Sequence, residues 1–349
     1  RRVGRLGVIA VLVFLALLVA GGVFTILVAP LSLDRLVLDP VAAANLRASL
    51  VSATSAATVP VQVPTLVQRL LDIVPVNPIK AAADGAVLPV VVFSLAFGLA
   101  LSRIAAEKRD AVAGACRGIA DTMLVLVGWV LRAAPAGVFA LALGLGMRMG
   151  VSSASTLLHY AVTLAAVMFA FTLAMYPVAA VFGRVPLRLF AAAALPAQAV
   201  GFSVRSSLAA LPALIAGARD TLKLSPTSTG FVLPLAVSVF RVNVPIAWVV
   251  GVLFLGKLYG IPVTEGQLAM LVVTGTLLSF SAPGIPSSSL LILAPVLVQN
   301  GIPAEGVGIL IAVDVMPDMF KTTANVTAHL ASVAIVARAE GARATEKDG

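Results

Sequence analysis

Charged residues are scarce in this sequence: only 11% of its 349 residues are Asp, Glu, Lys or Arg, whereas 60% are hydrophobic. A soluble globular domain carries about twice that share of charge, roughly 25%. Uncharged runs long enough to cross a bilayer as helices recur along the chain. The composition therefore excludes a soluble protein and indicates a multi-pass membrane protein.

Cysteine and aromatic residues are also rare. The single cysteine, Cys116, excludes an internal disulfide and cannot form a thiolate metal site alone, so we expect a small buried side chain there. Aromatic residues make up 6% of the chain, too few for a base-stacking platform, although the net charge is +9. The basic residues gather at the ends of apolar segments, as in cytoplasmic loops. We therefore expect a lipid bilayer as partner and no nucleic acid.

Several apolar segments predict membrane spans. The first, Gly7–Pro30, follows Arg1, Arg2 and Arg5, which mark its cytoplasmic side. The chain begins directly before this span and has no initiator Met, so we expect an N-terminal part to be missing. Later expected spans are Met123–Met147, Ser155–Gly183, Leu224–Leu255 and Gly306–Val336.

Two segments are too short or too interrupted for simple spans. Leu189–Val204 and Leu208–Ala218 flank the polar stretch Ser203–Ser207, and Gly266–Ala304 is uncharged but broken by prolines and serines at 281–289. Arms of about 15 residues reach only roughly 22 Å, less than the ~30 Å hydrocarbon core. We predict two re-entrant hairpins whose tips approach the mid-membrane from opposite sides, buried in protein or lining a water-filled cavity.

Each hairpin is followed by one span, a repeated pattern that indicates an inverted-repeat transporter. We assign residues 1–187 to a partial scaffold with associated spans, 188–338 to a transport core, and 339–349 to a charged tail. Neither His159 nor His329 has the spacing of a metal-ligand pair, and no serine lies in a nucleophile motif. We therefore expect no enzymatic activity and no cofactor.

A stripe of polar residues crosses the last span. At 3.6 residues per turn its members fall close to one helix face: Asp314, Asp318, Lys321, Thr322, Asn325 and His329. Each charge facing lipid would cost roughly 2.5–3.5 kcal/mol. One alternative is a helix end whose charges reach water. The length of the stripe favours a polar pathway or binding site.

These segments resemble the dicarboxylate/amino acid:cation symporter family, the glutamate transporter family, from residue 1 to about Arg338. The motifs, in order, are Arg2-Val-Gly-Arg5 with the third span, Leu71–Pro78 and Ala134–Leu141 in the fourth and fifth, Arg205-Ser206-Ser207 at the first hairpin tip, Phe231–Leu235 in the seventh helix, Gly284-Ile285-Pro286 at the second tip, and Asp314–Thr327 in the last helix. The resemblance implies an all-α, inverted-repeat fold in the cell (inner) membrane, a homotrimer, and two missing N-terminal spans.

The resemblance also implies a binding site for a small anionic solute, an amino acid or dicarboxylate such as glutamate, aspartate or a C4-dicarboxylate. Asp318 stands where the family binds the substrate's amino group, and Lys321 where dicarboxylate transporters carry an arginine. Thr322 and Asn325 match their polar neighbours. Backbone N–H groups at the hairpin tips, at residues 205–207 and 284–286, would hold the main carboxylate.

The departures from the family concern cation coupling. Phe240–Val244 replaces the seventh-helix pattern Asn-Met-Asp-Gly-Thr, Leu17 and Leu18 replace a Thr-Ser pair, and His329 replaces an aspartate. Two sodium sites therefore look dismantled, since sodium wants several oxygen ligands, although a carbonyl site near the second hairpin could survive. Arg241 would supply a built-in cation facing Asp314, Asp318 or the substrate, and His329 would carry a proton.

Alternatively, Arg241 points to a helix end or water and His329 only fills space. The function predicted is a symporter with altered or lost sodium coupling, and proton coupling is one possibility. The alternative is a non-coupled, channel-like or non-transporting relative.

Overall fold

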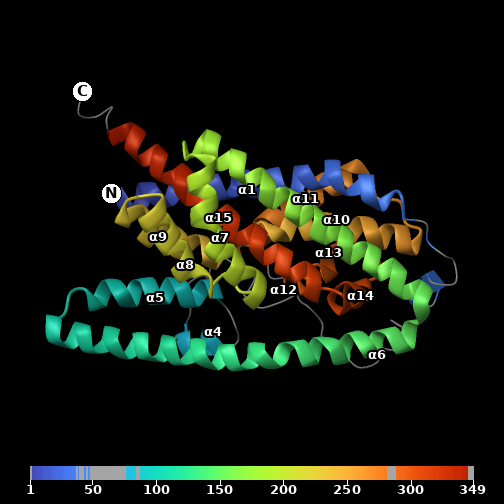
Figure 1. Ribbon diagram of the computed structural model, residues 1–349, viewed down its shortest axis with the longest axis horizontal. Coiled ribbons are helices and arrows are strands. Elements are labelled where there is room, and N and C mark those ends of the chain that lie inside the picture. The colour runs from blue at the N-terminus through green and yellow to red at the C-terminus, as the bar shows by residue number, and fades with distance from the viewer. Residues whose placement is uncertain are drawn as a thin grey trace. The chain divides into compact units, whose positions relative to one another are not determined.

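The computed structural model describes residues 2–36, 38, 43–44, 46–47, 76–83, 87–280 and 288–344. Within these ranges every regular element is a helix and none is a strand, which confirms the all-α prediction. The helices are α1 (Arg2–Leu33), α4 (Pro78–Ala83), α5 (Val87–Leu101), α6 (Ala106–Phe182), α7 (Leu187–Val204), α8 (Leu211–Ala216), the π-helical turn η1 (Gly217–Thr221), α9 (Pro226–Val239), α10 (Asn243–Tyr259), α11 (Glu265–Ser279), α12 (Ser288–Leu291), α13 (Ala294–Gln299), α14 (Gly306–Ala312) and α15 (Val315–Ala344), labelled in Figure 1.

Contacts divide the chain into two compact units. Unit 1 comprises Arg1–Pro60 and Leu145–Gly349, and unit 2 comprises Val61–Gly144, with α4, α5 and the first part of α6. Cys116, in unit 2, is exposed, so the expectation of a buried thiol was wrong. The described side chains around it are also mostly exposed. The contact division does not test the predicted functional boundary after residue 187.

Four described helical segments are long and apolar enough to cross a membrane: Arg5–Leu33, Ala154–Phe182, Leu187–Val204 and Pro226–Tyr259, the last of which comprises α9 and α10. The multi-pass prediction is confirmed in this respect. The expected separation of Met123–Met147 from Ser155–Gly183 was wrong, because α6 runs through both as one helix. The linking residues 148–154 contain no proline, and one glycine with two serines interrupts a helix only weakly.

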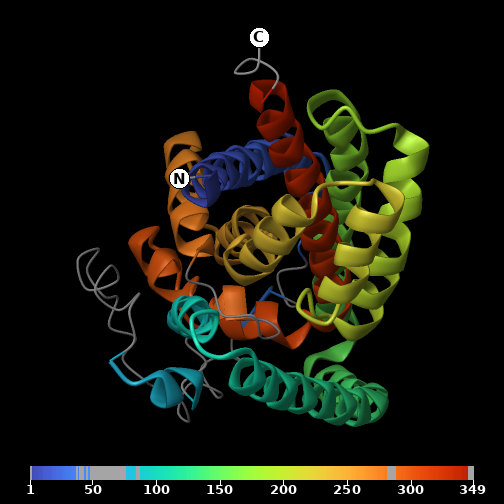
Figure 2. The ribbon, with the colours of Figure 1, turned by 90° about the vertical axis from the view of Figure 1, so that its left-hand side faces the viewer.

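Helix α10 forms the centre of unit 1. Fourteen of its residues are buried, from Asn243 to Leu258. It contacts α1, α11, α12 and α15, and Figure 2 shows it in the middle of these helices. A helix that is apolar on all sides is stable only when neighbours enclose it. α10 is therefore the buried centre of unit 1, and the polar helix α15 lies against it and against α7, α9 and α1.

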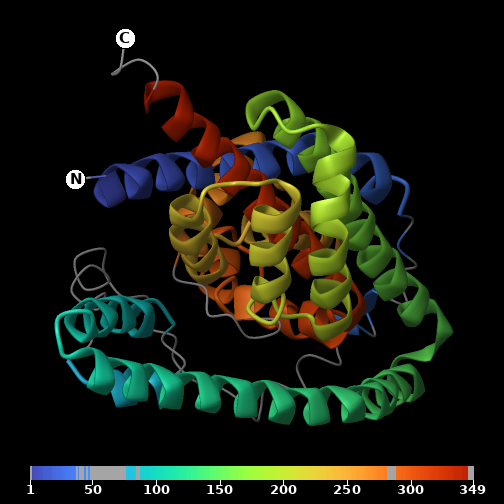
Figure 3. The same ribbon diagram turned by 60° about the vertical axis from the view of Figure 1, so that its left-hand side comes forward.

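The first predicted hairpin is present as a helix–turn–helix, but its first limb, α7, is long and apolar enough to cross a membrane, so the expectation that this limb is too short was wrong. α7 ends at Arg205, a left-handed residue (φ 54°), and the chain returns through α8 and η1, which both contact α7. In Figure 3 the two limbs lie next to each other, against α15. Gly217 lets the limbs approach closely, because a Cβ there would lie 2.4 Å from the Ala193 carbonyl oxygen.

We expect Gly217→Ala to destabilise the protein by about 1–3 kcal/mol, the usual cost of overpacking. The clashing atom is a backbone carbonyl oxygen, which cannot rotate away. Thermal unfolding in detergent measures the effect. Gly266→Ala is the matched control, since nothing lies within 4 Å of its Cβ position near the start of α11. Equal melting temperatures for both variants would contradict the close packing of the hairpin.

Two expected spans are each broken near their middle, which corrects the prediction of continuous helices over Leu224–Leu255 and Gly306–Val336. The chain leaves the helix at residues 240–242, between α9 and α10, and at 313–314, between α14 and α15. Pro245 and Pro317 are the third residues of the following helices. Proline has no N–H to donate, and its ring clashes with the carbonyl four residues earlier, here that of residue 241 or 313. The prolines account for both breaks.

The second predicted hairpin is described only in part. α11 ends at Ser279, and the helical chain resumes at Ser288 as two short pieces, α12 and α13, instead of the expected arm of about 15 residues. The predicted tip residues Gly284, Ile285 and Pro286 lie outside the described residues. The predicted tail begins inside α15, which continues to Ala344.

Candidate functional site

The polar stripe lies at the α14–α15 break and along the first turns of α15, inside unit 1. All six members are buried: Asp314, Asp318, Lys321, Thr322, Asn325 and His329, none more than 7% exposed. Their burial contradicts the alternative of a helix end whose charges reach water. A stripe of buried charges must find its partners within the protein.

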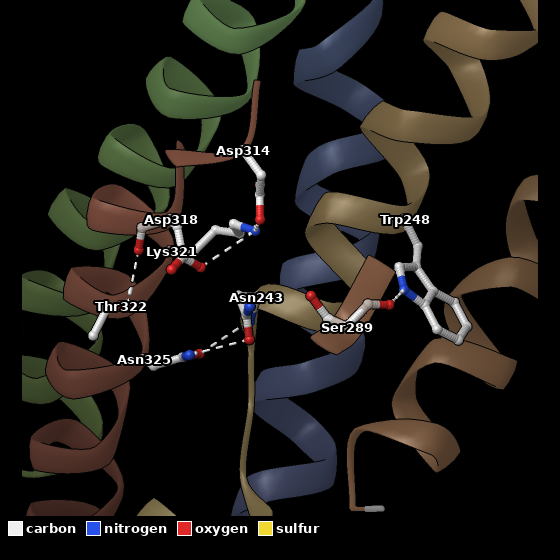
Figure 4. A network of polar contacts seen from close by, with 8 residues as sticks. All are labelled: Asn243, Trp248, Ser289, Asp314, Asp318, Lys321, Thr322 and Asn325. Carbon is white, nitrogen blue, oxygen red and sulfur yellow. Dashed lines mark hydrogen bonds and ion pairs between the residues drawn. The ribbon is translucent and has the colours of Figure 1, made fainter. Parts of the chain in front are cut away.

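Lys321 is the cation of this stripe. Its Nζ lies 2.6 Å from the Asp314 carboxylate and 3.5 Å from Oδ1 of Asp318. Figure 4 shows the ammonium between the two acids. The i,i+3 pair between Asp318 and Lys321 is thus the longer of the two contacts, and Asp314, seven residues before the lysine, is its closer partner.

The helix break explains how Asp314 reaches Lys321. Asp314 precedes the first residue of α15, and its carbonyl accepts the N–H of Asp318 at 2.8 Å. Helical side chains lean toward the N-terminus, so Lys321 extends back over two turns toward Asp314. Two carboxylates at the start of α15 are also stabilised by the positive end of its dipole.

The α9–α10 break is closed by side chains from other helices. His329 donates from Nε2 to the carbonyl of Phe240 at 2.7 Å, which leaves Nδ1 without a proton in the neutral ring. Asn325 accepts the N–H of Asn243 at 3.0 Å and donates to its side-chain oxygen at 3.0 Å. The protein's own groups thereby satisfy the polar groups of a buried, non-helical backbone segment.

Ser279, the last residue of α11, completes this closure. Its hydroxyl accepts the N–H of Arg241 at 3.1 Å and donates to the carbonyl of the same residue at 3.0 Å. Sequence reasoning missed Ser279, since 38 positions separate the partners and no motif contains this residue. Pro245 was the available signal, because it predicts a freed carbonyl at residue 241 that needs a donor.

The first hairpin tip adds positive charge. Arg205 is half-buried at the turn, the hydroxyl of Ser206 accepts the N–H of Ala209 at 3.3 Å, and Ser207 is buried. Arg205 and Arg241 both interact electrostatically with Asp318. Two arginines and Lys321 against two aspartates leave the cluster with one excess positive charge. That balance suits an anionic ligand.

Comparisons with known proteins agree with this arrangement. The model of the sodium:dicarboxylate symporter family matches residues 1–339. The chain belongs to this family. Membership confirms two predictions made from the sequence: the chain belongs to a family of membrane transporters, and the members of this family are transporters and not enzymes. The predicted homotrimer stays a prediction.

Individual relatives within this symporter family are distant. The chain is 29% identical over 271 residues to the proton/glutamate-aspartate symporter of Escherichia coli K12, covering 78% of this chain and 62% of the relative. It is 28% identical over 290 residues to the proton/sodium-glutamate symport protein of Bacillus caldotenax, covering 82% and 68%. It is 25% identical over 264 residues to the human neutral amino acid transporter A, covering 71% and 47%. The chain thus matches about half to two thirds of these relatives' lengths.

Several of the positions that the family resemblance associates with sodium hold buried apolar side chains. Phe240 stacks on Phe14 of α1, with ring centroids 4.6 Å apart and planes at 6°, and contacts the His329 ring at 5.6 Å. Leu17 and Leu18 are buried beside them on α1. In the described part of the chain, no group of three His, Cys, Asp or Glu residues is arranged to hold a metal ion.

Proposed function

We propose that this chain forms the transport core of a symporter for a small anionic solute, an acidic amino acid or dicarboxylate such as glutamate, aspartate or a C4-dicarboxylate. The observation that carries the proposal is the buried cluster of Asp314, Asp318 and Lys321, with Arg205 and Arg241 close enough to interact electrostatically with Asp318. It lies where a hairpin tip meets two broken helices, the arrangement of transporter binding sites. The names of the bacterial relatives, which are glutamate and aspartate symporters, support the same substrate class.

Asp318 is suited to an amino group. Its Oδ2 atom is buried and accepts no hydrogen bond from the described residues. A substrate ammonium would satisfy that oxygen, and the arginines would receive a carboxylate. An amino acid therefore complements the cluster better than a solute with no amine.

Coupling in this proposal does not run through the seventh-helix sodium position. The carbonyls of Phe240 and Arg241 already receive hydrogen bonds from His329 and Ser279. The ring of His329 has Nδ1 as its remaining acceptor, without a hydrogen-bond partner among the described residues. Burial of the ring, and then the positive charge of Arg241, oppose a positive charge there. An anion bound near Arg241 would offset that opposition, so anion and proton binding would favour each other.

We expect uptake of labelled aspartate into proteoliposomes to persist when choline replaces sodium, and to rise with an inward proton gradient. His329→Gln should retain uptake but lose most of the response to the proton gradient, because the amide cannot take up a proton. His159→Gln is the control, since that histidine bonds Ser32 away from the site. Strict sodium dependence, or an unchanged pH response in His329→Gln, would refute this coupling.

One observation favours the alternative function, a channel-like or non-transporting relative. The Lys321 ammonium is held by Asp314 at 2.6 Å, which withholds it from a substrate carboxylate. Substrate binding without accumulation against a gradient, in the same proteoliposomes, would support this alternative over the symporter.

A further inference from the structure

One buried polar side chain of the first hairpin lies outside the substrate cluster. Among the buried residues of α7, a helix that the structure describes throughout, Gln198 alone has a polar side chain. A buried amide is costly unless both of its groups are hydrogen-bonded. The Tyr176 hydroxyl of α6 donates to Oε1 of Gln198 at 3.2 Å, and Nε2 donates to the Thr327 hydroxyl of α15 at 2.8 Å. This one side chain therefore joins three helices.

The contacts beside this amide show how α7 lies along α15. Gly201, one turn further along α7, lies against two side chains of α15: a Cβ there would be 3.4 Å from Cγ2 of Thr322 and 3.1 Å from Cγ2 of Val326. The next residue, Phe202, meets Phe320 edge to face, with ring centroids 5.4 Å apart. As α7 proceeds, its contacts move toward the start of α15. The two helices are therefore antiparallel, and the hairpin tip lies toward the first turns of α15.

The same register leads from the amide to the substrate cluster. Asp318 is four residues before Thr322, so it shares the face of α15 that Gly201 contacts. It is the next residue on that face in the direction of the tip. The turn at the tip also depends on Gly201, whose carbonyl accepts the N–H of Arg205 at 2.9 Å. The register of α7 on α15 thus decides where the Arg205 turn lies relative to Asp318.

The small residues of α7 define this register only weakly. Three alanines and Gly201 make up most of its buried surface, and such residues let helices approach closely without long side chains that interlock. A slip of one residue would move the tip by about 1.5 Å. A single polar residue in an apolar helix interface specifies the register, because any other register leaves it buried without its partners. Gln198 is such a residue.

We propose that Gln198 is a positioning residue for substrate binding: its bond to Thr327 sets the register of α7 on α15 and so holds the Arg205 turn beside Asp318. The inference rests on the proposed function, in which the arginine receives a carboxylate of the substrate. Gln198 does not touch the substrate, because seven positions separate it from Arg205. It acts through the placement of α7.

The test is titration calorimetry of the purified protein with L-aspartate, which gives the Kd and the binding-competent fraction separately. Gln198→Met keeps the length of the side chain and removes both hydrogen bonds. It should raise the Kd about tenfold, the worth of one charge-assisted hydrogen bond between the arginine and the substrate. The binding-competent fraction should stay unchanged. The melting temperature should fall only slightly, since the Thr327 hydroxyl still donates to the Thr323 carbonyl at 2.7 Å.

Substitutions of Thr327 test the same bond from its other end. Thr327→Val should raise the Kd by a similar factor, whereas Thr327→Ser keeps a hydroxyl and should keep the wild-type Kd. Gln198→Met combined with Thr327→Val should raise the Kd no further than either change alone, because both remove one interaction. Tyr176→Phe is the matched control. It removes the other hydrogen bond of the amide, so it should lower the melting temperature and leave the Kd nearly unchanged.

Three results would overturn the inference while the proposed function stands. They are an unchanged Kd in Gln198→Met or in Thr327→Val, a loss of binding-competent protein at an unchanged Kd, and additive increases in the double variant. If the wild-type protein binds neither L-aspartate, L-glutamate nor succinate, the proposed function fails and the inference fails with it.

Discussion

Replacing Lys321 by methionine is expected to destabilise the protein by about 3–5 kcal/mol, the range found when one partner of a buried ion pair is removed. The methionine side chain fills similar space but leaves Asp314 and Asp318 as two buried carboxylates, 0% and 7% exposed. Their nearest cation, 2.6 Å from one and 3.5 Å from the other, would be gone. Denaturant unfolding of the purified protein in detergent measures the loss.

A second substitution distinguishes loss of the ion pair from loss of packing. Asp314→Asn together with Lys321→Met removes the closer anion with its cation, and should recover most of the lost stability because the Asp314 carboxylate is no longer buried without its ion-pair partner. Lys80→Met, at an exposed lysine of α4, should change stability by less than about 0.5 kcal/mol. If Lys321→Met were as mild as Lys80→Met, Lys321 would not be the counter-ion of these aspartates.

The polar stripe illustrates what the sequence could and could not establish. Helical spacing correctly predicted that Asp314, Asp318 and Lys321 lie on one face. That prediction does not depend on whether the helix begins one turn earlier or later. The spacing could not show that Asp314 lies outside the helix. Pro317, which breaks the hydrogen-bond ladder at residue 313, was in the sequence and carried that information.

Contacts across the fold were beyond the sequence. Asn243 and Asn325 are 82 residues apart, and the bond from His329 to Phe240 spans 89. Such pairs are set by which helices pack together, and no local pattern encodes that choice. Polar residues on one helix predicted that buried partners must exist, and only the structure identifies them.

The two broken helices have one physical feature in common. In each, a proline at the third helical position frees backbone groups near the centre of unit 1. At the first break these groups bond Ser279, Asn325 and His329, and at the second the break frees Asp314 to bind Lys321. The polar residues of α15 therefore serve both breaks, which makes α15 the element on which site geometry and stability depend together.

Asn325 offers the clearest test that site geometry and stability both depend on α15. Its side chain accepts the N–H of Asn243 at the start of α10 and donates to the Asn243 side chain, both at 3.0 Å. Asn325→Ala leaves two buried partners unsatisfied, at about 1–3 kcal/mol each. We expect a loss of about 2–5 kcal/mol in unfolding free energy, and a loss of aspartate binding, because α10 and α15 are no longer held in register beside Lys321.

The control for this change is Asn300→Ala. The Asn300 side chain, at the end of α13, is half-buried and among the described residues donates to the carbonyl of Val296 four positions earlier, so its removal should have a small effect. In an Asn243→Ala background, Asn325→Ala should cost less than in the wild type, since one of its two partners is already absent. Strictly additive losses in that cycle, measured by the same denaturant unfolding, would show that Asn325 stabilises the protein by some route other than the α9–α10 break.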